Sequence, residues 1–180
     1  DRKHLYTINL WARLPFRILV TIARVPCRDS DALYRGIQGI DWEPYLSPAH
    51  TLAVKATGKN QQLNHSHFTA LQVKNAIVDQ QQDRYGERSD VDTEKPDVQI
   101  NVHINDNKAT ISLDSSGSSL HRRGYRPAMG TAPLKESLAA ALVRLTEWSG
   151  NGAFLDPMCG SGTLPIEATL QALNNAPGLF

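Results

Sequence analysis

Hydrophobic and polar residues alternate most strictly between positions 98 and 113, and this alternation predicts a β-hairpin. Every second residue from Val98 to Ile104 is a branched aliphatic one, and every second residue from Ala109 to Leu113 is apolar. Side chains two residues apart lie on the same face of a strand, so each segment has one face suited to burial. The polar residues 105–108 between the two segments are then expected to form the turn.

Weaker patterns before this hairpin predict further strands and helices. Apolar runs or alternation indicate strands at 5–11, 18–25 and 51–57. Apolar residues spaced by three or four positions indicate helices at 29–39 and 66–82. Helices and strands interleaved in this way are typical of a small α+β module, and we expect it to end near Ser115.

The end of the chain shows a strand followed by a helix. Ala153 to Leu155 are interpreted as the end of a buried strand and Thr163 to Asn174 as a helix. Gly160 and Gly162 in the intervening loop allow a sharp turn and leave room for a ligand against the bare backbone. In open α/β sheets, ligands bind at the carboxyl ends of strands, where a helix N-terminus offers N–H groups. The loop is therefore a candidate nucleotide-cofactor site.

The spacing within this loop disfavours the common phosphate-binding motifs. The dinucleotide fingerprint has a third glycine three residues after the second, where this chain has Pro165. A P-loop has lysine directly before Ser or Thr, whereas Gly162 precedes Thr163 here. We therefore do not expect NAD, FAD, ATP or GTP. A glycine turn that merely opens an α/β helix remains the alternative to a cofactor site.

Asp156 and the following Gly-Ser-Gly turn resemble motif I of class I methyltransferases, which bind S-adenosylmethionine. The resemblance implies that N–H groups around Gly160 to Gly162 face the methionyl carboxylate. It also implies that Asp156 helps to place the ammonium group and the ribose. The cofactor-binding residues expected on this basis are Asp156, Pro157, Met158, Cys159, Gly160, Ser161, Gly162, Thr163 and Pro133.

Two upstream segments make the resemblance more specific. Residues 120–126 and 132–136 are similar to the stretch before motif I in the THUMP-containing RNA guanine-N2 methyltransferases, in particular the bacterial large-subunit ribosomal RNA type. The resemblance implies an α+β THUMP/ferredoxin-like RNA-binding module followed by the first β-α segment of an α/β Rossmann-like methyltransferase domain. We expect a partial ferredoxin-like subdomain at 1–27, a THUMP domain at 28–115 and the start of the methyltransferase domain at 116–180.

The resemblance implies S-adenosylmethionine-dependent methylation of guanine N2 in 23S ribosomal RNA. In that family an Asn/Asp-Pro-Pro-Tyr/Phe motif holds the target amine, and this chain contains no such tetrapeptide. We therefore assign no catalytic residue and interpret the chain as an inactive, N-terminal portion of an enzyme. A stand-alone RNA-binding module and a DNA adenine N6-methyltransferase are the alternatives.

Charge is distributed unevenly along the chain although the formal net charge is only +1. Residues 115–135 contain no acid, whereas residues 79–97 are rich in acids. A basic segment can face a phosphate backbone, although surface ion pairs would also account for its arginines. The residues that we expect to contact RNA are Arg122, Arg123, Tyr125, Arg126, Lys55, Lys59 and Lys74.

Other classes of protein find little support in the sequence. No apolar run approaches the ~20 residues that cross a bilayer, and we expect a cytoplasmic protein without membrane contact. Cys27 and Cys159 form no disulfide framework and are expected to remain thiols. His65 and His67 have no partner at metal-site spacing, so no metal is expected.

Overall fold

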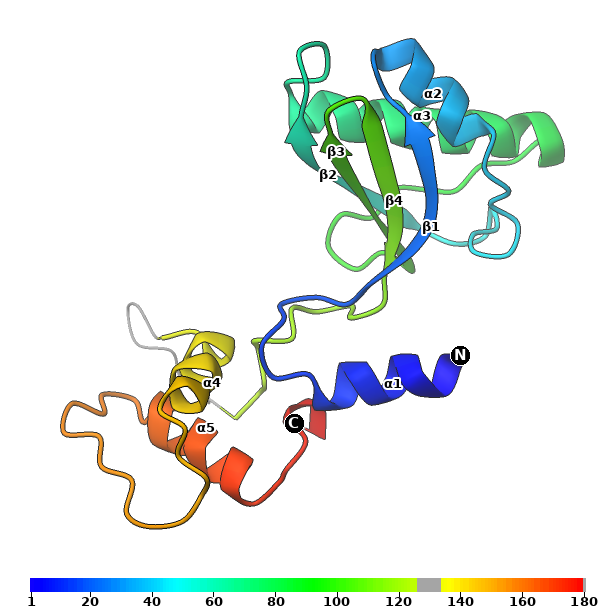
Figure 1. Cartoon of the computed structure of the whole chain (residues 1–180). Coiled ribbons are helices and arrows are strands. Elements are labelled where there is room, and N and C mark those ends of the chain that lie inside the picture. Colours follow the sequence, from blue (N-terminus) through cyan, green and yellow to red (C-terminus); the bar gives the residue numbers. More distant parts are fainter. Residues whose placement is uncertain (126–133, 180) are drawn as a thin grey trace. The chain divides into compact units, whose positions relative to one another are not determined.

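The computed structural model describes residues 1–125 and 134–179, which form two compact units (Figure 1). One unit comprises Leu19–Asp114. The other combines Asp1–Ile18 with Ser115–Phe180. Arg126 and Pro133, two of the residues expected at the site, lie outside the described residues.

The Leu19–Asp114 unit contains a mixed four-stranded sheet in the order β1-β4-β3-β2. Its strands are β1 (Leu19–Pro26), β2 (Leu52–Lys59), β3 (Val98–Asn105) and β4 (Lys108–Asp114). The expected hairpin is confirmed, because β3 and β4 pair antiparallel from Asn105↔Lys108 to Ile100↔Leu113. β2 pairs parallel to β3, and β1 pairs antiparallel to β4 at the other edge.

Two helices, α2 (Ser30–Gln38) and α3 (Ser66–Tyr85), pack on one face of this sheet (Figure 1). Leu33 and Ile37 of α2 join Ile77 of α3 and the inward residues Ile100 and Ile111 in one fully buried core. Burial of such aliphatic side chains supplies the main favourable free energy of folding. The predicted α+β fold and both predicted helices are confirmed.

The helix ends follow from local chemistry. Asp29 caps α2, because its carboxylate accepts a hydrogen bond from the Ala32 N–H at 2.8 Å, and this bond lowers the pKa of Asp29. His65 caps α3 through its Nδ1, which accepts from the Phe68 N–H at 3.4 Å. Gly86 ends α3 in the left-handed conformation, with φ of 71°.

Gly58 allows β2 and β3 to approach closely near their ends. Its φ is +74°, and a Cβ added there would lie 1.9 Å from the backbone oxygen of Ile104. No other residue fits this position without moving backbone. The close pairing brings Lys59 opposite Asn105, at the end of the sheet where the β3–β4 turn begins.

The second unit is built from short helices. α4 (Glu136–Leu145) packs against α5 (Thr163–Ala172), and the shared interior contains Ala139, Ala140, Val143 and Ala168. α1 (Arg2–Trp11) packs against the short helix η1 (Pro177–Leu179), where a Cβ on Gly178 would lie 3.0 Å from the Leu10 backbone. Residues 115–120 hydrogen-bond to residues 16–18, which joins the N-terminal segment to this unit.

Two predicted strands are wrong. Residues 2–11 form α1, in which the partly buried positions Leu5 and Asn9 are four residues apart, so the apparent alternation at 5–11 concealed a helical period. Residues 153–155 form no strand, and Leu155 is 85% exposed. Within the described residues of this unit no strand is available for pairing, and an isolated strand leaves its backbone groups unpaired.

The helices of the described residues include none that is long and apolar enough to span a membrane.

Candidate functional site

The glycine loop before α5 is folded by its own short-range hydrogen bonds. The Asp156 Oδ1 accepts from the Met158 N–H at 3.1 Å, and the Gly162 N–H donates to the Cys159 carbonyl at 2.8 Å. Gly160 and Gly162 both have positive φ, at 52° and 75°. These two bonds and two left-handed residues turn the chain sharply into α5.

The loop leads directly into the N-terminus of α5. Gly162 is the residue before the helix, and no side chain caps this end. The Ile166 N–H makes a helical hydrogen bond to the Gly162 carbonyl at 3.0 Å. Pro165 lies in the first turn, where a missing N–H costs no helical hydrogen bond. The partial positive charge of this terminus favours an anionic group.

The outer side of the loop is open. A Cβ built on Gly160 would meet no atom within 4 Å, and Met158 is 90% exposed. The Cys159 thiol is also exposed. By contrast, Cys27 lies in the other unit, where burial raises the pKa of its thiol. The loop therefore offers bare backbone and a helix N-terminus along one open wall, as the glycine spacing predicted.

A buried ion pair connects α5 to the segment before α4. The Arg123 Nε lies 3.2 Å from the Glu167 Oε1, and the same oxygen accepts from the Tyr125 hydroxyl at 3.0 Å. The Arg123 Nη2 also donates to the Arg13 carbonyl. Burial raises the pKa of Glu167, although the Arg123 charge acts in the opposite direction.

Sequence reasoning missed Glu167, although a signal was present. Glu167 is the only charged residue of α5. A lone acid surrounded by apolar helical residues is rarely buried unless it is paired. Arg13 was missed as well: its Nη2 donates to the Leu170 carbonyl at 3.1 Å, and burial lowers its pKa.

The expected RNA contacts at residues 122–126 are not equivalent. The structure contradicts the assignment of Arg123, because its side chain is buried against Glu167 and cannot reach a phosphate. Tyr125 directs its hydroxyl to the same carboxylate. Arg122 is exposed, and it is the described member of this group that could contact RNA.

Two of the three expected lysines, Lys55 and Lys74, lie on opposite sides of the sheet. Lys55 is an exposed residue of β2 between the inward positions Val54 and Ala56, so it belongs to the face that α2 and α3 leave open. Lys59 is exposed at the end of β2, after Gly58, whose positive φ interrupts the strand alternation. Lys74 is on α3, which packs on the other face. One flat RNA surface therefore cannot contact all three.

The described residues contain no group of three or more His, Cys, Asp or Glu side chains that could hold a metal ion. His65, which the sequence singled out, caps α3 instead.

Comparison with known proteins assigns both parts of the chain. Residues 27–114 match the THUMP domain model, and residues 123–180 match the RMKL-like methyltransferase domain model. A Synechocystis protein described as a candidate RNA methyltransferase is 60% identical over 180 residues, which are 100% of this chain and 47% of that protein. The ribosomal RNA large subunit methyltransferase K/L of Syntrophotalea carbinolica is 48% identical over 97% of this chain and 25% of its own length.

Solved structures described as methylases or methyltransferases are also similar to this chain. A Listeria monocytogenes structure described as a predicted N6-adenine-specific DNA methylase is 35% identical, has a TM-score of 0.81 and is matched over 94% of this chain and 45% of that one. SMU.472, a methyltransferase candidate complexed with SAH, is 30% identical with a TM-score of 0.81, over 99% of this chain and 47% of that one.

The chain spans about half the length, or less, of the curated relatives that it matches. The resemblance inferred from the two motifs is confirmed along nearly the whole chain. This chain belongs to the THUMP-containing methyltransferases, as a THUMP domain joined to the first part of an RMKL-like methyltransferase domain.

Proposed function

We propose that the protein is an S-adenosylmethionine-dependent RNA methyltransferase, to which this chain contributes the RNA-binding domain and one wall of the cofactor site. The observation that carries the proposal is the open backbone at Gly160, in a loop that leads into the uncapped N-terminus of α5. An anionic group placed there meets N–H groups and the positive end of the helix. The methionyl carboxylate of S-adenosylmethionine is such a group.

The residues present fit the amino-acid end of this cofactor. Gly160 and Gly162 allow close approach, and the carboxylate of Asp156 lies at the start of the same turn. The Oδ1 of Asp156 is used to fold the loop, which leaves its second oxygen for an ammonium or a hydroxyl group. When bound, S-adenosylmethionine supplies an electrophilic methyl group. The exposed Met158 and Cys159 border this wall, and we assign no covalent role to Cys159.

We infer further that the target is guanine N2 in 23S ribosomal RNA. Support comes from the sequence resemblance and from relatives named as ribosomal RNA large subunit methyltransferases. The lone pair of this exocyclic amine is delocalised into the ring, so alignment with the methyl donor is the main task of the enzyme. The base would have to leave its stack to reach the cofactor. A ribosomal RNA substrate would also imply a cytoplasmic protein.

DNA adenine N6-methylation is the second candidate, because one similar structure carries that description. The THUMP domain match at 27–114 and the ribosomal relatives favour RNA. A stand-alone RNA-binding module is the third candidate. The methyltransferase model match over residues 123–180 argues against it.

Methyl incorporation by the full reading frame that encodes this chain tests the proposal. We expect transfer from labelled S-adenosylmethionine to 23S ribosomal RNA and none to duplex DNA, with the label at guanine N2 after nucleoside digestion. The Gly160→Asp variant, which places a negative charge beside the bound carboxylate, should reduce transfer by at least about tenfold. Label on adenine in DNA, or no transfer to any nucleic acid, would overturn the proposal.

A further inference from the structure

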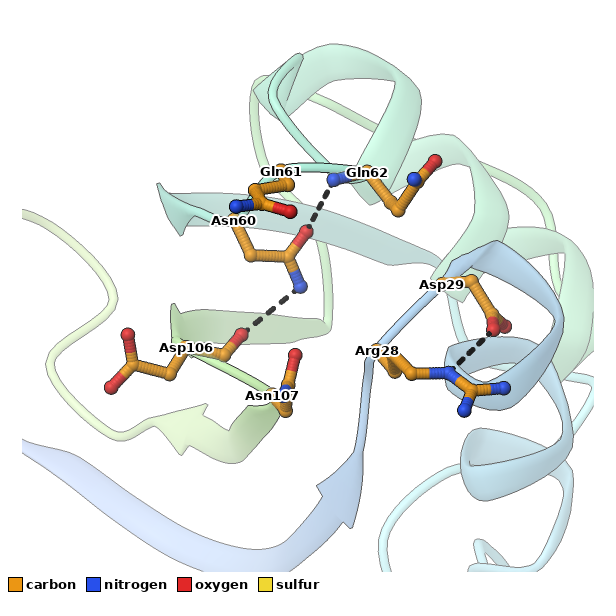
Figure 2. Close-up of a pocket in the computed structure, with 7 residues that line it drawn as sticks. All are labelled: Arg28, Asp29, Asn60, Gln61, Gln62, Asp106 and Asn107. Carbon is orange, nitrogen blue, oxygen red and sulfur yellow. Dashed lines mark hydrogen bonds and ion pairs between the residues drawn. The ribbon is translucent and has the colours of Figure 1, made fainter.

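A polar cavity lies at one end of the THUMP sheet, and none of its lining residues belongs to the buried hydrophobic core. It has a volume of about 760 Å³ and is lined by three segments: residues 28–29 after β1, residues 60–62 after β2 and residues 106–107 in the β3–β4 turn. These three segments meet because the C-terminal ends of β1, β2 and β3 lie at the same end of the sheet. Figure 2 shows the residues that face this space.

Asn60 fixes the shape of the cavity. Its Nδ2 donates to the Cys27 carbonyl at 2.7 Å and to the Asp106 carbonyl at 3.0 Å, which ties the end of β1 to the hairpin turn. Its Oδ1 accepts from the Gln62 N–H at 3.0 Å (Figure 2) and from the Leu63 N–H at 2.7 Å. One side chain therefore holds all three segments, and the cavity is formed before any ligand arrives.

The cavity presents amide groups that have no partner. The side chains of Gln61, Gln62 and Asn107 are exposed and make no hydrogen bond to any residue in the described part of the chain. Each amide has both a donor and an acceptor, the combination that reads the edge of a nucleobase. Most small-molecule pockets are instead predominantly apolar.

One basic residue lines the cavity, and two more are next to its lining residues in the chain. Lys59 directly precedes Asn60, and Lys108 directly follows Asn107; both are exposed. Arg28 lies at the cavity and pairs with Asp29 at 3.3 Å, in an exposed contact that a phosphate can replace at little cost. Asp29 is already used as the cap of α2, and Figure 2 shows the Asp106 carboxylate directed away from Asn60.

We propose that this cavity binds an unpaired nucleobase of single-stranded RNA, with Gln61, Gln62 and Asn107 on the base and Arg28, Lys59 and Lys108 on the flanking phosphates. A paired base has its Watson–Crick edge occupied, so these amides select single-stranded over double-stranded RNA. The inference rests on RNA binding by the THUMP domain, as proposed above. It deepens that function by naming the state of the RNA that this domain recognises.

The test compares two RNA probes on the 180-residue chain. One probe is a mixed-sequence single strand of about ten nucleotides, and the other is a blunt duplex of about 16 base pairs. We expect tighter binding of the single strand. The Gln61→Ala/Gln62→Ala variant and the Asn107→Ala variant should each weaken single-strand binding roughly tenfold, through lost hydrogen bonds. Neither should change the dependence of affinity on salt, because no charge is removed.

A matched control removes two amides elsewhere. The Gln72→Ala/Asn75→Ala variant changes α3, outside the cavity lining, and should leave both affinities within about twofold of wild type. Equal binding of both probes, or cavity variants that bind like this control, would overturn the inference while RNA binding itself stands. Failure of the wild-type chain to bind either RNA would overturn the inference together with the proposed RNA-binding role.

Discussion

The Nε of Arg123 lies 3.2 Å from the Oε1 of Glu167, and the two side chains are 1% and 0% exposed. This pair joins the segment before α4 to the helix that follows the glycine loop. A buried charge without its partner is strongly unfavourable, so the pair constrains both segments. Its net contribution to stability is small, because the desolvation cost of both charges offsets their attraction. Arg123, which the sequence suggested as an RNA contact, therefore has a structural role.

Removal of Glu167 should therefore loosen α5. We expect Glu167→Ala to lower the opening free energy of α5 by about 3–5 kcal/mol, because Arg123 would remain buried and unpaired. Hydrogen exchange of the α5 amides measures this opening free energy directly. Arg122→Ala, which removes the neighbouring exposed arginine, is the control and should change the same amides by less than about 0.5 kcal/mol.

The double variant Arg123→Met/Glu167→Leu separates pairing from packing. Replacement of both partners by apolar residues should recover most of the loss. Equal protection of α5 in Glu167→Ala and Arg122→Ala would show that the pair constrains nothing.

Arg122 should affect RNA binding through its charge. For Arg122→Gln we expect the slope of log affinity against log salt concentration to become shallower by about 0.7–0.9, the value of one phosphate contact. Fluorescence titrations with ribosomal RNA fragments at several salt concentrations measure the slope. Arg88→Gln, in the acidic segment, serves as the control. If both variants keep the wild-type slope, Arg122 lies outside the RNA interface.

The two sides of the THUMP sheet should differ in RNA binding. Because Lys55 is on the open face and Lys59 is exposed at the end of the same strand, while Lys74 is on the covering helix, we expect Lys55→Gln/Lys59→Gln to reduce the salt slope by about 1.4–1.8. Lys74→Gln should leave it unchanged in the same titrations. The reverse result would place the RNA on the helical side.

Cofactor binding to this chain alone should be weak. The glycine loop forms one open wall, with Met158 and Leu155 largely exposed, so most of a bound cofactor would remain in water. We expect calorimetry with S-adenosylmethionine to give no resolvable heat at micromolar protein. A micromolar affinity, abolished by Gly160→Asp, would mean that this wall suffices by itself.

Tyr34 provides a pH probe of the contact between α2 and α3. Its hydroxyl donates to the Asp79 carboxylate, and this bond raises the pKa of Tyr34 from 10.0 to about 12. Because the folded pKa lies above the unfolded one, the contribution to stability is complete below pH 10 and is lost as pH rises toward 12. Tyrosinate absorbance of wild type minus Tyr34→Phe should show a transition near pH 12, and Asp79→Asn should move it toward 10. A difference transition that stays near 10 in wild type would exclude the hydrogen bond in solution.

The sequence determined the elements whose period and ends are local. The β3–β4 hairpin follows from strict alternation, and α2 and α5 follow from apolar spacing that starts next to Asp29 and Gly162. The glycine loop was also readable, because the positive φ of Gly160 and Gly162 is a backbone conformation that glycine adopts at no steric cost. These features depend on neighbours in the chain.

Only the tertiary structure decided what each charged or apolar side chain meets. Whether residues 2–11 form a helix, whether Leu155 is buried and which of Arg122 and Arg123 reaches solvent depend on partners far away in sequence. Glu167 lies 44 positions from Arg123, and the cavity around Asn60 joins segments from three strand ends. Burial and charge pairing are set by contacts of this kind, so a local pattern can indicate that a residue matters but not which group it will face.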